Sequence, residues 1–209
     1  MIVCKKSEER LHRAKVKICG LFRDVDIDFV NAAMPDYAGF VFFAKSHRNI
    51  DIETAKRFRA RLDKNIKSVG VFVDEPLESM VQYCLGDTLD VIQLHGSEDN
   101  GYIEKLRRLT DKEIWQAFKI RSNEDVLKAN ASAADMLVLD NGKGTGHTFD
   151  WSLLKGVERQ FFLAGGINTE NIGEALKIRP YGIDVSSGAE TDKVKDKTKI
   201  DKIVKECRK

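Results

Sequence analysis

The sequence predicts a (β/α)8 barrel, the TIM-barrel fold. Short apolar runs, each followed by a segment with helical periodicity, alternate along the 209 residues. Runs rich in Val, Ile, Leu and Phe are typical of parallel strands buried on both faces. Eight such units, in a chain of this length, favour a closed barrel. The predicted strands are residues 16–19, 37–43, 68–73, 90–94, 114–120, 136–140, 161–164 and 182–185.

Helices between these strands are predicted from apolar periodicity and from capping residues. Residues 24–33 and 51–62 place apolar side chains on one helix face. Asp74-Glu75-Pro76 predicts a cap with proline in the first turn. Ser122 and Asp125 match a capping box. Further helices are predicted after Asp150, after Asn168 and over residues 196–207.

An open doubly wound sheet is the alternative arrangement for this alternation. The even spacing of the units, and the polar residues that follow nearly every predicted strand, favour the barrel. We predict a single barrel domain over residues 15–209, since the sequence shows no internal repeat or linker. Residues 1–14 are charged and helix-prone, and they are predicted to form an N-terminal extension, either an extra helix or a disordered arm.

Composition narrows the class of protein. The chain is 42% hydrophobic and 33% charged, and its 35 Lys and Arg residues against 33 Asp and Glu residues give a net charge of +2. This balance argues against a nucleic-acid partner. The sequence has neither a signal-peptide core nor an apolar stretch of membrane-spanning length, so we expect a cytoplasmic protein without a membrane partner. Its four cysteines show no zinc or C-x-x-C spacing, so no metal is expected.

Two predicted strands end in residues that can exchange protons. Asp140 follows the apolar run 136–139 and precedes a glycine-rich stretch, and Cys19 ends the first strand just before Gly20. The strands of a barrel all end on one face, so a carboxylate and a thiol would flank one cavity there. Cys19 has a simpler alternative, an inert core thiol, because cysteine is among the most often buried residues. To act as a base, its thiol would need a local positive field.

The last two strands carry a phosphate signal. Gly165 and Gly166 follow the seventh predicted strand, and Ser186 and Ser187 follow the eighth. Barrels often bind phosphate between these two loops through backbone N–H groups. Each loop alone is equally well explained as a tight turn, but the two together favour a phosphorylated ligand.

Other strand-end residues have open interpretations. Arg48 suits a substrate carboxylate through its planar fork, or it is a surface arginine. His95 is an acid, a base, a hydrogen-bonding group or a structural histidine. The loop after Asp140 matches no nucleotide motif and is either a substrate-covering loop or a connector, with Lys143 or His147 near ligand or exposed.

Seven motifs in order along the chain resemble those of the phosphoribosylanthranilate isomerase family of tryptophan biosynthesis. One of them alone is weak, but seven in sequence are specific. They are Lys17-Ile18-Cys19-Gly20, Gly39-Phe40-Val41-Phe42 with Ser46 and Arg48, Gly70-Val71-Phe72-Val73, Gln93-Leu94-His95-Gly96, Leu139-Asp140 with Gly144-Thr145-Gly146 and Phe149-Asp150-Trp151, Leu163-Ala164-Gly165-Gly166-Ile167, and Asp184-Val185-Ser186-Ser187-Gly188.

This resemblance implies an Amadori rearrangement of N-(5-phosphoribosyl)anthranilate, a phosphorylated aminosugar, without a cofactor or a metal. It assigns Asp140 as general acid, Cys19 as general base and Arg48 as the partner of the anthranilate carboxylate. His95 is expected to bind substrate, and the two glycine and serine loops to bind the phosphate. A monomer or a homodimer is expected. The chain departs from the family pattern around the expected anthranilate pocket, at Phe22, His47 and Asn49.

Three rival functions remain at the level of sequence. The histidine-pathway isomerase performs similar chemistry, but it has an aspartate where this chain has Cys19. A non-catalytic phosphate-binding barrel would have no need of both Cys19 and Asp140. A thiol-redox protein is disfavoured because the chain has no C-x-x-C motif.

Overall fold

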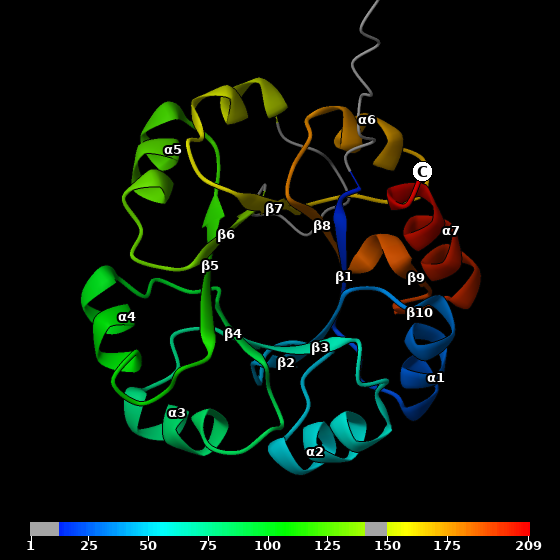
Figure 1. Cartoon of the computed structure of the whole chain (residues 1–209), viewed down its shortest axis with the longest axis horizontal. Helices are drawn as coiled ribbons and strands as arrows, with labels where there is room; N and C mark the ends of the chain where they lie inside the picture. Colours follow the sequence, from blue (N-terminus) through cyan, green and yellow to red (C-terminus); the bar gives the residue numbers. More distant parts are fainter. Residues whose placement is uncertain (1–12, 141–149) are drawn as a thin grey trace, which may run out of the picture.

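The fold is a closed barrel of eight parallel strands, as predicted, in a computed structural model that describes residues 13–140 and 150–209. Neighbouring strands pair in chain order from β1 to β8. The ring closes where β8 pairs with β1, with Lys15 opposite Gly182 and Lys17 opposite Asp184. Figure 1 shows the strands as a central ring surrounded by helices. This closure excludes the open doubly wound sheet.

The strand boundaries agree with the predicted ones to within one residue. The strands are β1 Lys15–Cys19, β2 Tyr37–Phe42, β3 Lys67–Phe72, β4 Val91–Leu94, β5 Glu113–Lys119, β6 Met136–Asp140, β7 Phe161–Leu163 and β8 Gly182–Val185. A short hairpin that the sequence analysis did not predict, β9 Glu190–Thr191 and β10 Val194–Lys195, follows β8.

Helices cover the outside of the barrel. The α-helices are α1 Asp24–Ala33, α2 Ile52–Arg61, α3 Leu77–Cys84, α4 Asn100–Leu106, α5 Asn123–Asn130, α6 Ile172–Lys177 and α7 Lys197–Cys207. Two 3-10 helices, η1 Trp151–Gly156 and η2 Ser187–Ala189, complete the set in the described residues. No helix in these two ranges is long and apolar enough to cross a membrane.

Capping residues define several of these helix starts. The predicted capping box of Ser122 and Asp125 is present at α5. Asp150 accepts a hydrogen bond from the Ser152 N–H at the start of η1, and Asp196 caps α7 in the same way. These caps satisfy N–H groups that have no partner inside the helix.

The predicted cap at Asp74 is wrong. Pro76 occupies the N-cap position of α3 and makes no side-chain cap. Asp74 instead accepts hydrogen bonds from the N–H of Ser97, at 2.6 Å, and from its hydroxyl, at 2.7 Å. The loops after β3 and β4 are neighbours in the barrel, so donors from the next loop compete with the helix that follows in sequence.

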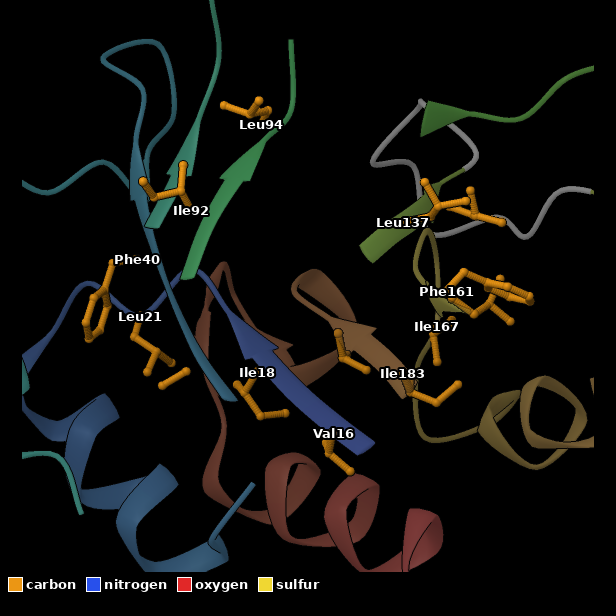
Figure 2. Packing of buried hydrophobic residues seen from close by; sticks show 14 of the residues in the cluster. Val16, Ile18, Leu21, Phe40, Ile92, Leu94, Leu137, Phe161, Ile167 and Ile183 are labelled. Carbon is orange, nitrogen blue, oxygen red and sulfur yellow. The ribbon is translucent and has the colours of Figure 1, made fainter. Parts of the chain in front are cut away.

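Two apolar cores result from strand alternation, since successive side chains of a strand point to opposite faces. The outer core fills the space between strands and helices. Figure 2 shows Val16 and Ile18 on the side of β1 that faces the helices. The inner core fills the barrel with Tyr37, Val69, Val91, Trp115, Val138, Phe162 and Ala164.

Aromatic packing blocks the barrel interior. The rings of Trp115 and Phe162 stack with their centroids 4.7 Å apart, and Tyr37 meets both rings edge-on. The barrel is therefore a packed core and not a pore, so any site must lie at the strand ends, where the interior side chains become polar.

Replacing Phe162 by alanine should destabilise the protein by about 3–5 kcal/mol, because the side chain is fully buried and its cavity would be bounded by rigid rings. Urea denaturation measures this change. Leu127→Ala is the matched control: its side chain is 67% exposed, so the change should stay within about 0.5 kcal/mol. Similar losses in the two variants would contradict a packed barrel interior.

Candidate functional site

Cys19 ends β1 inside the barrel, 8% exposed. Its register partner on β2 is Gly39. A Cβ atom on Gly39 would lie 2.8 Å from the Cys19 sulfur, so the missing side chain leaves the space that the thiol occupies. Gly20 follows with a φ of +79°, and a Cβ atom there would lie 2.3 Å from Cδ of Arg48. Glycine is required at position 20 because of this positive φ and because a side chain would clash with Arg48. The missing side chain lets Arg48 lie next to the thiol.

An ion pair lies inside the barrel beside Cys19. Lys17 is fully buried, and its ammonium donates to Oδ2 of Asp184 at 2.8 Å. Burial by itself would lower the pKa of Lys17, but the charges and hydrogen bonds of Asp184 and Cys19 raise it above its ordinary value. Lys17 is therefore a cation at neutral pH. Burial raises the pKa of the Cys19 thiol, and Lys17 opposes this rise by its charge and a hydrogen bond.

Arg48 does not extend freely into solvent. Its Nε and Nη2 atoms donate to the two carboxylate oxygens of Glu190, each at 2.7 Å. The buried ammonium of Lys195 is bonded to the same carboxylate and also donates to the Ser186 carbonyl at 3.2 Å. Burial would raise the pKa of Glu190, but Arg48 and Lys195 outweigh it and lower the pKa to about 2. Two cationic side chains therefore share one carboxylate beside Cys19.

Asp140 is the last residue of β6, and it faces His95 across the barrel end. His95 Nε2 lies 3.8 Å from Oδ2 of Asp140. The Gln93 amide nitrogen lies 3.2 Å from His95 Nδ1. The direction of this hydrogen bond depends on the tautomer of the imidazole, and the buried amide oxygen of Gln93 has no partner among the described residues. Burial lowers the pKa of His95 despite the Asp140 charge, so the imidazole is neutral at pH 7.

The two loops predicted to hold phosphate pack against each other. A Cβ atom on Gly188 would lie 1.9 Å from the Ile167 carbonyl oxygen, so glycine is needed for this contact. Gly165 and Gly166 both have positive φ, +83° and +70°. Within the described residues, no hydrogen bond takes up the backbone N–H groups of Gly165, Gly166 and Ser187. The loops thus bring donors to one place.

The structure brings the predicted residues to one end of the barrel. The pKa of His95 is affected by Asp140, Lys17 and Asp184, and Lys17 and Asp184 also affect Cys19. A pocket of about 460 Å³ opens beside His95, between the ends of β4 and β5. The predicted cover loop, with Lys143 and His147, and the motif residues Gly144-Thr145-Gly146 and Phe149 lie outside the described residues, as does most of the extension over residues 1–14.

Four charged residues of the site were not predicted from the sequence: Lys17, Asp184, Glu190 and Lys195. Lys17 and Asp184 each interrupt an apolar strand, and this signal was available in the sequence. Glu190 and Lys195 lie in a hairpin that has no distinctive pattern. Two of the three departures from the family pattern contact each other: the rings of Phe22 and His47 meet edge to face, with centroids 6.1 Å apart.

The strand ends of this closed barrel hold a thiol, a carboxylate and a neutral imidazole, beside loops whose N–H groups have no partner among the described residues. This combination is typical of a barrel enzyme of the acid–base class. Comparison with known protein families then identifies the family to which this enzyme belongs. Residues 16–206 match the model of the family described as N-(5'phosphoribosyl)anthranilate (PRA) isomerase. The chain belongs to this family, and it is an isomerase.

Individual relatives and solved structures of this family match this chain over nearly its whole length. The N-(5'-phosphoribosyl)anthranilate isomerase of Endomicrobium trichonymphae is 47% identical over 91% of this chain and 96% of its own. The N-(5'-phosphoribosyl)anthranilate isomerase of Clostridium kluyveri is 48% identical, over 93% of this chain and 98% of its own. The Thermotoga maritima isomerase, a dimeric protein crystallised as monomers, superposes with a TM-score of 0.82 at 33% identity, covering 93% of this chain and 98% of its own.

A further solved structure of this family holds a ligand. It is a phosphoribosylanthranilate isomerase in complex with reduced 1-(o-carboxyphenylamino)-1-deoxyribulose 5-phosphate, and it superposes with a TM-score of 0.81 at 32% identity. The match covers 93% of this chain and 98% of that one.

The Arg48–Glu190–Lys195 cluster predicts a pH-dependent contribution to stability. The folded-state pKa of Glu190, about 2, lies below its ordinary value of 4.5. Its contribution is therefore complete above pH 4.5 and is lost as the pH falls toward 2. Glu190→Gln should cost about 3 kcal/mol at pH 7, because it leaves the buried Lys195 and the partly buried Arg48 without a counter-charge.

Denaturation at pH 7, 4.5 and 3.5 measures this difference, which should shrink as the pH falls. Glu53→Gln is the control, since Glu53 pairs with Lys56 on the surface and is 73% exposed. A difference that stays constant with pH would show that Glu190 is not ionised against these cations.

Proposed function

We propose that this chain converts N-(5-phosphoribosyl)anthranilate into 1-(2-carboxyphenylamino)-1-deoxyribulose 5-phosphate, with Asp140 as general acid and Cys19 as general base. The observation that carries the assignment of these roles is the placement of both groups, in a chain of this family, at the same end of one barrel: Cys19 ends β1 and Asp140 ends β6. Such a position is where barrel enzymes hold their reacting groups.

The reaction needs two proton transfers. Asp140 gives its proton to the furanose ring oxygen, the bond from C1′ to that oxygen breaks, and the anilino nitrogen supplies the electrons that form a Schiff base. The Cys19 thiolate then removes the C2′ proton, and those C–H electrons form the C1′–C2′ double bond of an enolamine. Tautomerisation gives the ketone. One acid and one base are sufficient for these steps, without a redox change.

His95 is assigned a supporting role. Its neutral ring faces the Asp140 carboxylate with Nε2, 3.8 Å away, and we assign the ring proton to this nitrogen. A neutral donor here can stabilise Asp140 after it has lost its proton, and it can also donate to a sugar hydroxyl, without adding a fixed positive charge.

Arg48 is assigned to the anthranilate carboxylate. Glu190 takes up Nε and Nη2, which leaves Nη1 as a donor at the other edge of the guanidinium. The two hydrogen bonds to Glu190 therefore hold the guanidinium of Arg48 in place before substrate binds. Since Lys195 offsets the charge of Glu190, the cluster keeps an excess positive charge for an incoming carboxylate.

The phosphate is assigned to the loops of Gly165, Gly166, Ser186 and Ser187. Their N–H groups and hydroxyls suit a phosphate that needs no metal, and a phosphate bound there would fix the sugar between the acid and the base. The ligand is thus a small phosphorylated aminosugar. We further propose a cytoplasmic enzyme, monomeric or homodimeric, that acts in tryptophan biosynthesis.

Cys19→Ala and Asp140→Asn should each lower kcat by about a thousandfold or more while substrate binding is largely kept, because each removes one of the two proton-transferring groups. The decay of substrate fluorescence, with the substrate generated in situ, measures turnover. Cys84→Ala is a matched control, since Cys84 is also a buried free thiol but lies on α3. Normal turnover in either Cys19→Ala or Asp140→Asn would exclude this mechanism.

Arg48→Lys should raise KM by about 10- to 100-fold and change kcat much less, because lysine keeps the charge but loses the planar fork. The control is the same measurement with a substrate analogue that carries aniline in place of anthranilate and so has no carboxylate. The wild type and Arg48→Lys should have similar KM and kcat values with this analogue. An equal penalty on both substrates would show that Arg48 does not bind the carboxylate.

A further inference from the structure

Lys17 is a buried cation that the proposed acid–base steps do not use. It lies two residues before Cys19 on β1, so the two side chains share the inner face of the strand. Lys17 is 0% exposed, and its register partner on β8 is Asp184, the acceptor of its 2.8 Å hydrogen bond. Burying such a pair is costly, and apolar residues would fill the same space at less cost.

The donors of Lys17 are not all used by Asp184. An ammonium has three N–H groups, and one of them reaches Oδ2 of Asp184. The other oxygen, Oδ1, is buried and has no hydrogen-bond partner among the described residues. Asp184 thus holds Lys17 through a single contact, which leaves N–H groups available for the sulfur of Cys19, further along the same face of β1.

We propose that Lys17 is a positioning residue that stabilises the Cys19 thiolate when the base forms, with Asp184 as the counter-charge that keeps the ammonium in place. This inference rests on the proposed role of Cys19 as the base. This role explains why the chain contains a buried ion pair at this position. A thiolate is stabilised by a nearby cation, and Lys17 provides that cation from inside the barrel, where the ammonium cannot contact solvent.

Four charged side chains face the thiol from the elements around it. Lys17 lies on β1 itself, Asp184 on β8, Lys195 on β10 and Arg48 on the loop after β2. Arg48 and Lys195 are both bonded to Glu190, which weakens their field at the sulfur. Burial raises the pKa of Cys19 and Asp184 adds to the rise, whereas Lys17 lowers it by both its charge and a hydrogen bond.

The test is the alkylation of Cys19 by iodoacetamide in the free protein, followed by peptide mass spectrometry between pH 6 and pH 10. Lys17→Met/Asp184→Asn removes both charges and so leaves no unpaired carboxylate, which protects folding. We expect this variant to react at least about tenfold more slowly than the wild type at pH 7, with its rate–pH profile shifted by at least about one unit to higher pH, because one pKa unit is a tenfold change in thiolate.

In the double variant, the loss of the Asp184 charge by itself would lower the pKa of Cys19, so a slower reaction reports the loss of Lys17. Lys15→Met is the matched control, since Lys15 lies on the same strand but pairs with Asp36 and is half-exposed, and it should react at the wild-type rate.

A double variant that folds normally and reacts like the wild type would overturn the inference. Turnover retained by Cys19→Ala would instead exclude the proposed function, and the alkylation rates would still report on Lys17.

Discussion

The parallel pairing of β8 with β1 is the constraint on which the rest of the structure depends. It turns a sheet into a closed barrel, so every strand has one face toward the helices and one toward a narrow interior. Aromatic rings fill part of that interior and leave its carboxyl-terminal end for polar side chains. The same pairing sets Lys17 opposite Asp184, so the contact that closes the barrel also places a cation beside Cys19.

The electrostatics of the site follow from burial. Each charge inside the barrel end has a partner: Lys17 has Asp184, and Arg48 and Lys195 share Glu190. Buried ions are costly unless they are paired and hydrogen-bonded, so these pairs fix side chains that would otherwise move. The low pKa of Glu190 keeps this arrangement intact over the physiological pH range.

Rigidity at the site comes from backbone as much as from charge. Gly20 and Gly39 leave the space into which Arg48 and the Cys19 thiol fit, and Gly188 lets the loops after β7 and β8 touch. These close approaches hold Cys19, Arg48 and the loops after β7 and β8 in place. Because a preorganised site has less to reorder in the transition state, such packing serves catalysis as well as stability.

The sequence by itself determined the order of the strands, the capping box at Ser122 and the presence of Cys19 and Asp140 at strand ends. These features are local, because apolar periodicity and capping depend on neighbours within a few residues. Only the tertiary structure decided that Asp74 bonds to Ser97, that Arg48 bonds to Glu190, and that Lys17 and Asp184 form a pair. Each of these contacts joins residues far apart in sequence, and the physical reason is barrel closure, which chooses partners by strand register and burial.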